Sequence, residues 1–215
     1  MIKKANNKAF TLIELLIVIA IIGLLAALAL PAITGALARA QLTGIVSNAR
    51  QIHVAAQQQA LDVLTGSSTV GWPGDSGNSP ATASAKAFLG TLKDNGYLKE
   101  AEVIKLVSGP GFPAAASWTA LANTNIQFRI GNVTSGEAGT VMWLWTKNFE
   151  PNSDNPLTAT ALKATVGPGK AGFVIFRKGG DGQSFQEKTL DLAAAVKEQT
   201  MGSMPASTTK VLTDS

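Results

Sequence analysis

An acidic residue stands inside an apolar stretch near the start of this chain. Glu14 follows Phe10-Thr11-Leu12-Ile13, and no other charged residue occurs between Lys8 and Arg39. A charged side chain in a segment of hydrocarbon length costs roughly a few kcal/mol or more, so its presence indicates a function. A carboxylate in such a place can neutralise a cation that a neighbouring chain supplies. We therefore expect Glu14 to act in the assembly of several chains.

The segment around Glu14 is long enough to cross a bilayer. Every residue from Leu15 to Leu30 is apolar or glycine, and the flanking residues extend this run over 10–33, which reaches the roughly 20 residues that a bilayer core requires. The lysines in the first nine residues have no acid beside them. This asymmetry predicts a cytoplasmic N-terminus and an extracytoplasmic remainder of the chain.

Two residues weaken the predicted membrane helix. Pro31 removes a backbone hydrogen bond and crowds the preceding turn, so we expect a kink or local melting there. Gly23 is the second weak position, and together they bracket Leu24 to Leu30, whose helicity could be given up when neighbouring helices pack. Gly23 and Pro31 are therefore predicted assembly residues beside Glu14.

An amphipathic pattern continues the helix over residues 34–66. Apolar residues recur at steps of three and four, and the glutamines and asparagines lie mostly off this stripe. The stripe consists of Ile33, Leu37, Ala40, Leu42, Ile45, Ala49, Ile52, Ala56 and Val63. Thr65-Gly66-Ser67-Ser68 is typical of a helix C-terminus. A continuous helix from Phe10 to about Leu64 would be about 80 Å long.

Three features resemble the N-terminal region of type IV pilins and type II secretion pseudopilins. They are the short basic leader, the run from Phe10 to Gly23, and the later Pro31. The resemblance covers about residues 1–64 and implies a pilin-like α+β fold. It further implies that a prepilin peptidase cuts between Ala9 and Phe10 and methylates the new amine of Phe10. Ala9 stands where the family usually has glycine. The implied partners are identical or homologous subunits and an inner-membrane assembly platform.

The physical role of Glu14 agrees with this resemblance. Cleavage would create a positive amine on Phe10 at the membrane interface, and Glu14 of a neighbouring subunit could neutralise it as the helices pack. Because an unpaired charge in lipid is penalised, the pair would favour a staggered register between subunits. The chain would then leave the inner membrane for a pilus or pseudopilus filament.

The apolar segment also fits two simpler membrane-targeting roles. An uncleaved membrane anchor would account for the lysines and the apolar run, but it gives Glu14 no role. A secretory signal peptide is the second alternative, because Ala27-Leu28-Ala29 and Ala36-Leu37-Ala38 fit the small-x-small cleavage pattern. Its apolar core would be unusually long and would contain an acid.

Charge and composition exclude several classes of function. The net charge of +4 comes mostly from the leader: without residues 1–9, 15 basic residues face 14 acidic ones, or +1. We find no basic stripe or recognition motif for nucleic acid. The chain has no cysteine, so no disulfide can close the domain.

We expect no enzyme. The stretch Gly74-Asp75-Ser76-Gly77 mimics a protease nucleophile loop, but the single histidine, His53, lies too near to this stretch along the chain for a catalytic triad of that fold.

The remainder, residues 67–215, is predicted to be an extracytoplasmic α+β domain. Helical spacing covers Thr82 to Lys93 and Lys99 to Val107. The predicted strands are Asn125–Ile130, Val141–Thr146, Phe173–Arg177 and a fourth near Ser184–Thr189, and a short helix is expected over Leu192–Gln199 before a mobile tail. One face of this antiparallel sheet should bury against the apolar stripe of the helix, with Trp143 and Trp145 in the core.

A calcium site is an open possibility in the domain. Some pseudopilins hold this ion in a C-terminal loop, and the resemblance would place it at Asp154 and Asp181, because calcium takes oxygen ligands from loops.

Taken together, the sequence favours a filament subunit, with a monomeric, membrane-anchored binding module as the alternative.

Overall fold

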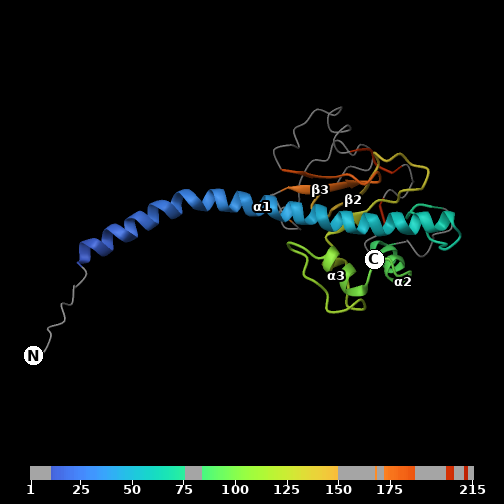
Figure 1. The fold of residues 1–215 in the computed structure, drawn as a ribbon, viewed down its shortest axis with the longest axis horizontal. Helices are drawn as coiled ribbons and strands as arrows, with labels where there is room; N and C mark the ends of the chain where they lie inside the picture. Colours follow the sequence, from blue (N-terminus) through green and yellow to red (C-terminus); the bar gives the residue numbers. More distant parts are fainter. Residues whose placement is uncertain are drawn as a thin grey trace, which may run out of the picture. The chain divides into compact units, whose positions relative to one another are not determined.

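The structure, a computed structural model, describes residues 11–75, 84–149, 168, 172–186, 202–205 and 211–212. It confirms the predicted α+β class: a long N-terminal helix precedes a small antiparallel sheet of four strands (Figure 1). The elements are α1 (Leu12–Leu64), α2 (Ala85–Asp94), α3 (Glu100–Val107), the 3-10 turn η1 (Asn123–Asn125), β1 (Phe128–Ile130), β2 (Met142–Thr146), β3 (Phe173–Arg177) and β4 (Gly182–Phe185). The predicted helix over Leu192–Gln199 lies outside the described residues.

The chain divides into two compact units, residues 1–39 and 40–215, and α1 contributes to both. In the first unit the structure describes helix from Leu12 onward. The second unit contains the rest of α1, both short helices and the whole sheet. The two units are therefore described separately.

The helix of the first unit is unbroken at Pro31. A kink or local melting was expected at this residue; the melting is wrong for the single chain, because Pro31 lies inside the continuous helix, and the kink stays a prediction. Thr34 Oγ1 donates to the carbonyl oxygen of Pro31 at 3.0 Å, whereas the carbonyl that loses its helical N–H donor is that of Ala27, four residues before the proline. A proline removes only one N–H donor from the ladder, whereas melting would unpair several backbone groups in an apolar segment.

The second unit is built around the C-terminal half of α1, which packs against the sheet. Its buried residues are Leu42, Ile45, Ala49, Ile52, His53, Ala55, Ala56 and Gln59. They share one core with Trp143 and Leu144 of β2 and with Val174 and Phe176 of β3. The predicted burial of one sheet face against the helix stripe is confirmed.

The burial along α1 differs from the predicted stripe at several positions: the stripe residues Ile33 and Leu37 are 60% and 57% exposed, while Gln59, which was not part of the stripe, is buried. Gln59 is fully buried: its Nε2 donates to the Gly71 carbonyl and its Oε1 accepts from Asn95 Nδ2, both at 3.4 Å. Val63 is 37% exposed. The helix ends at Leu64 as predicted, and Gly66 takes a positive φ of 76° there.

The sheet has the strand order β1-β2-β3-β4, and all neighbours are antiparallel. β1 starts at Phe128 rather than Asn125, because the Asn125 side chain accepts the Ala122 N–H at 2.9 Å and holds η1 instead. β4 begins at Gly182, earlier than predicted. The tight turn at Gly180, with φ of 93°, lets pairing restart directly at Phe176 and Gly182.

The second face of the sheet carries its own aromatic cluster. Trp145, Phe149, Phe173 and Phe185 are buried there, and the partly buried Met204 and Val211 pack against the cluster. The rings of Phe149 and Phe173 stack with centroids 4.2 Å apart. Trp143 and Trp145 thus lie in the core, as predicted, but on opposite faces of β2.

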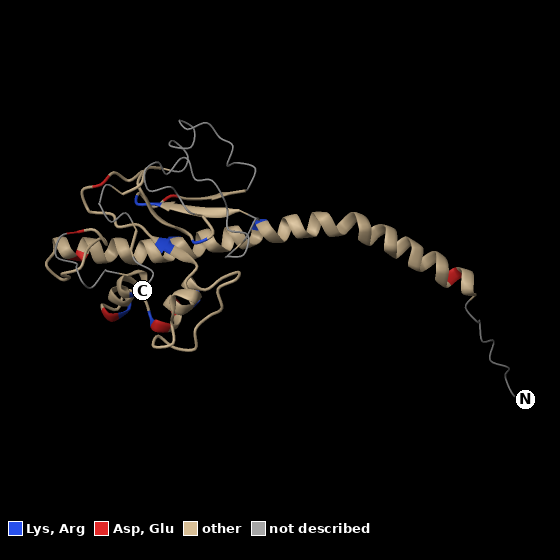
Figure 2. Ribbon diagram, turned by 180° about the vertical axis from the view of Figure 1, so that it is seen from behind, with Lys and Arg blue, Asp and Glu red and all other residues tan. Residues whose placement is uncertain are grey.

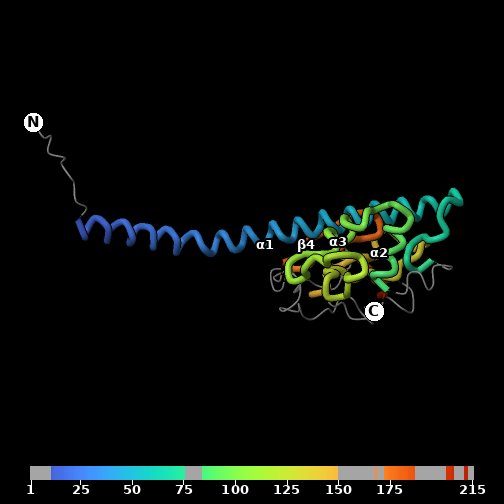
Figure 3. The backbone as a smooth tube through the Cα atoms, turned by 90° about the horizontal axis from the view of Figure 1, so that it is seen from below, coloured from blue at the N-terminus to red at the C-terminus, as the bar shows by residue number. Residues whose placement is uncertain are grey.

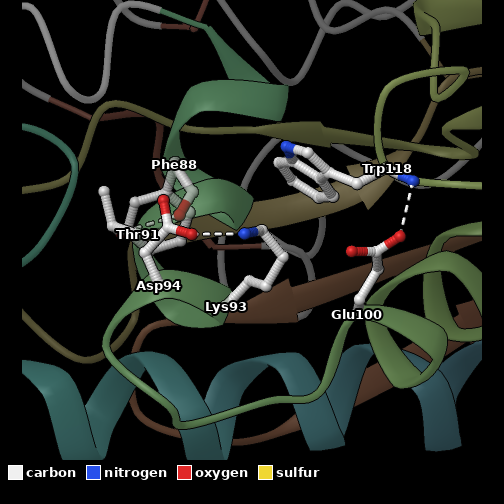
Figure 4. Close-up of polar contacts among 6 residues, drawn as sticks. All are labelled: Phe88, Thr91, Lys93, Asp94, Glu100 and Trp118. Atoms are coloured by element: carbon white, nitrogen blue, oxygen red, sulfur yellow. Dashed lines mark hydrogen bonds and ion pairs between the residues drawn. The ribbon is translucent and has the colours of Figure 1, made fainter.

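The short helices complete the first core. α2 starts at Ala85, later than predicted, because Ser84 Oγ accepts the Ala87 N–H and caps it. Figure 4 shows Trp118 beside α2, where its backbone N–H donates to Glu100 Oε1 at 2.8 Å. Lys93 pairs with Asp94, and its Nζ lies 5.3 Å from the centroid of the Trp118 ring.

Seen from below, the described sheet and short helices lie on one flank of this part of α1 (Figure 3). Val54 and Leu61 of this part of α1 are 48% and 54% exposed. Both residues belong to the second unit.

Candidate assembly site

The carboxylate of Glu14 caps the start of α1. Glu14 Oε2 accepts the backbone N–H and the side-chain hydroxyl of Thr11, each at 2.8 Å. In return, Thr11 Oγ1 accepts the Glu14 N–H at 3.3 Å. This reciprocal pair is a capping box, in which the residue at N-cap and the residue three positions later satisfy each other's backbone donors.

The capping box gives Glu14 polar partners inside an otherwise apolar segment. In a single chain these bonds offset part of the cost of a charge near lipid. They also hold the carboxylate at the helix N-terminus, where the positive end of the helix dipole favours a negative charge. The carboxylate keeps one oxygen, Oε1, to which no partner is assigned among the described residues. The bonds to Thr11 therefore fix the position of the Glu14 carboxylate, and its Oε1 can still accept a hydrogen bond from a second chain.

Thr11 is a residue of the candidate site that the sequence-based prediction missed. The signal was present, because Thr-x-x-Glu before an apolar run is the sequence signature of a capping box. The prediction treated Glu14 only as a charge in an apolar segment and left its helix position out of account.

The remainder of the first unit presents apolar side chains. Its large hydrophobic residues between Leu12 and Leu37 are 47% to 83% exposed. Figure 2 shows this part of α1 almost free of charged residues, and Glu14 is its one acid before Arg39. Among the described residues, α1 is the helix that is long and apolar enough to cross a membrane.

The structure places Gly23 and Pro31 within this exposed apolar helix. No atom lies within 4 Å of the position that a Cβ of Gly23 would occupy. A side chain would therefore fit at this position in the single chain. The assembly role of Gly23 stays a prediction.

The predicted processing and metal residues are only partly described. Ala9, Phe10 and Asp154 lie outside the described residues. Asp181 lies in the turn between β3 and β4, where its carboxylate pairs with Arg177. Among the described residues, no group of three acidic, histidine or cysteine side chains could hold a metal ion.

Of the protease-like residues, Asp75 and His53 have structural roles, and Ser76 and Gly77 lie outside the described residues. Asp75 accepts the N–H of Trp72 at 2.9 Å and that of Ser135 at 2.6 Å, so it ties two loops together. His53 is 3% exposed and lies among the rings of Trp72, Trp143 and Phe176. Burial lowers the pKa of His53 to about 4, although the charge of Asp181 acts in the opposite direction.

The comparison with protein families agrees with the geometry of the first unit. Residues 4–30 match the family model of the prokaryotic N-terminal methylation motif. No curated protein and no solved structure matches the chain. The matched residues contain the end of the leader, the Thr11–Glu14 capping box and the exposed apolar helix up to Leu30. The chain thus carries the N-terminal methylation signal of type IV pilins and pseudopilins, in front of an α+β domain with a pilin-like arrangement.

Proposed function

We propose that this chain is the structural subunit of a type IV pilus-like or type II secretion pseudopilus filament, assembled through its N-terminal helix. The observation that carries the proposal is the single carboxylate of an exposed apolar helix, held at the helix start by Thr11 within a methylation motif. Such a helix needs either lipid or other helices around it.

In this proposal a prepilin peptidase removes residues 1–9 by cutting after Ala9 and methylates the amine of Phe10. The precursor lies in the bacterial inner membrane with its N-terminus in the cytoplasm and its domain outside, and the assembly platform extracts it from there. The lysines before the apolar segment support this orientation. No residue of the chain has a catalytic role in the proposal.

The assembly step uses the free acceptor capacity of Glu14. The methylated amine of Phe10 from one subunit would meet the carboxylate of Glu14 from its neighbour while the Thr11 bonds persist. Because both groups leave water, the pair is favourable only when they are aligned, and this selects a staggered register. Gly23 and Pro31 would let neighbouring helices adjust to close packing.

Two measurements on the full chain test the proposal. Mass spectrometry of the mature protein should find a chain that starts at methylated Phe10, and an intact Met1 or a product cut after Ala29 or Ala38 would contradict it. Electron microscopy should show helical filaments after shearing, whereas discrete particles would favour the anchored binding module.

A Glu14 variant separates assembly from processing. Glu14→Ala should be cleaved and inserted normally but should form few filaments, because the amine then has no partner. Leu12→Ala, which changes an exposed apolar residue of the same turn, is the matched control and should assemble. Equal filament yields from Glu14→Ala and the wild type would refute the assembly role.

A further inference from the structure

A pocket of about 340 Å³ lies in the second unit, beside the C-terminal end of α1. Four segments that are far apart in the sequence line it: the last turns of α1, the loop after α1, the loop between β1 and β2, and the turn after β3. Such a volume is at the lower end of the range for small-molecule sites in proteins.

Backbone hydrogen bonds between these segments hold the walls of the pocket together. The Lys178 N–H donates to the Val141 carbonyl oxygen at 2.9 Å and joins the turn after β3 to the loop before β2. The Gly74 N–H donates to the Val133 carbonyl oxygen at 2.7 Å and joins the loop after α1 to the loop after β1. The pocket is therefore built by the fold of the domain.

Lys178 is the one charged residue among the described residues that line the pocket. Its Nζ donates to the carbonyl oxygens of Ser135 at 2.7 Å and Glu137 at 2.5 Å, and it lies 5.7 Å from the centroid of the Trp72 ring. An ammonium group has three N–H donors, and the described part of the chain supplies two acceptors to this one. Lys178 therefore has one hydrogen bond left to donate.

No ion pair joins Lys178 to a carboxylate among the described residues. Asp75 accepts the N–H groups of Trp72 and Ser135, and Glu137 accepts a backbone N–H of its own loop. Burial lowers the pKa of Lys178, while the charges of Glu137 and Asp75 act in the opposite direction. A partly desolvated ammonium group is stabilised by an anion that binds beside it.

Apolar side chains supply much of the remaining lining. Leu61 and Leu64 of α1 are 54% and 81% exposed, and Trp72 lies beside them in the lining. An apolar group in the pocket would remove leucine surface from water. The pocket thus combines an apolar wall with one cation that lacks an ion-pair partner.

We propose that this pocket binds a small organic acid, whose carboxylate accepts a hydrogen bond from Lys178 and whose apolar body packs against Leu61 and Leu64. Charge complementarity selects the acid, and the apolar wall selects its body. The inference goes beyond the proposed function and does not depend on it, because the pocket lies entirely within the second unit.

Other small ligands fit the pocket less well. A neutral sugar would need an open aromatic face, but Trp72 is 7% exposed, with Lys178 over its ring and the edge of Trp143 against it. A cationic ligand would meet the positive charge of Lys178, and like charges oppose such binding.

Two matched probes test the proposal in the full chain. Phenylacetate and its neutral amide, phenylacetamide, are titrated into ¹⁵N-labelled protein in detergent micelles, and NMR follows the backbone amides of Ser135 and Gly139 and the indole N–H of Trp72. We expect saturable shifts at these three residues. The dissociation constant should be about tenfold lower for the acid, because a charge-assisted hydrogen bond is stronger than a neutral one.

Lysine variants show whether Lys178 provides this preference. Lys178→Met should bind the acid and the amide equally, whereas Lys178→Arg keeps the charge and should keep the preference. Lys86→Met is the matched control, because Lys86 also donates to a carbonyl oxygen, that of Leu121 at 2.6 Å, and lies 5.8 Å from the centroid of the Trp118 ring. The control should bind both probes as the wild type does, and partition into micelles is common to all variants and cancels.

A second pair of variants leaves the hydrogen bonds of Lys178 intact. Leu64 is exposed, so Leu64→Glu and Leu64→Gln should both fold. The added negative charge should weaken the binding of phenylacetate in Leu64→Glu relative to Leu64→Gln and leave that of phenylacetamide unchanged. Urea unfolding, followed by tryptophan fluorescence, verifies that each variant is folded.

Three results would overturn the proposal. They are equal affinities of the wild type for the acid and the amide, shifts that do not saturate at the three reporter residues, and a loss of preference in Lys86→Met equal to that in Lys178→Met. None of these results bears on filament assembly. A chain that binds phenylacetate as expected but forms no filaments would refute the proposed function alone.

Discussion

Acidification should weaken the second unit through one buried histidine. The rings of Trp72, Trp143 and Phe176 surround His53 with centroids 5.2–5.8 Å away, and its Nδ1 has no hydrogen-bond partner among the described residues. The neutral imidazole suits this site because a charge would lack solvent. The perturbation is a fall in pH from about 7 to 4, compared between the wild type and His53→Leu.

The sign and size follow from the pKa of His53, which burial lowers from 6.5 to about 4. Above pH 6.5 the imidazole is neutral in both states, and its contribution to stability is fully present. As the pH falls toward 4, the unfolded chain binds a proton that the folded chain does not, so stability is lost. At about 1.4 kcal/mol for each pH unit the loss would approach about 3.4 kcal/mol at lower pH, and at pH 4, where the folded imidazole is half protonated, it is about 2–3 kcal/mol.

Two assays measure this effect in untagged full chain. Urea unfolding between pH 7 and 4, followed by tryptophan fluorescence, should show a loss in the free energy of unfolding that is about 2–3 kcal/mol greater for the wild type than for His53→Leu. The carboxylates contribute equally to both proteins and cancel. Because the chain has one histidine, its imidazole proton resonance reports the folded pKa directly. A folded His53 that titrates near 6.5, or equal losses in both proteins, would refute the reasoning.

Three further predictions concern other parts of the chain. Thr11→Ala removes the cap of α1, which costs about 1 kcal/mol, and should lower filament yield less than Glu14→Ala; an effect equal to that of Glu14→Ala would contradict a merely supporting role for Thr11. Gly90→Leu should destabilise the domain by about 1–3 kcal/mol in urea unfolding, because a Cβ at this position meets the Trp118 ring at 3.2 Å, whereas Gly44→Leu meets no atom within 4 Å and should not. If Asp154 and Asp181 bind calcium, a chelator should lower the melting temperature of protein purified with calcium, and an unchanged value would remove the site.

Local patterns were sufficient where one interaction decides the structure. The bounds of β3 were predicted correctly, because Phe173 to Arg177 is a short apolar run that ends at the Gly179–Gly180 turn. The end of α1 at Leu64 followed from Gly66. The limits of β1 and β4 were predicted less accurately. The start of β1 depends on the hydrogen bond between Asn125 and Ala122, and the start of β4 depends on the pairing of Phe176 with Gly182. These contacts are formed in the folded chain, and no hydrophobic pattern reveals them.

The candidate site shows the same division. Glu14 and the apolar run were evident from residue type and spacing, while the bond to Thr11 was missed because the helix was predicted to start at Phe10 and the Thr-x-x-Glu signature was not used. The run from Gln57 to Gln59 was predicted to lie mostly off the apolar stripe, but Gln59 is buried, because Asn95 and Gly71 from two separate loops satisfy its amide.

The sequence alone determined that the chain carries a basic leader and a membrane-length helix with one acid, because charge and hydrophobicity are properties of single residues. Tertiary structure decided which side of α1 meets the sheet and which aromatic residues enclose His53. Those features arise when segments far apart in the chain pack together, and this packing decides whether a buried polar group has a hydrogen-bond partner.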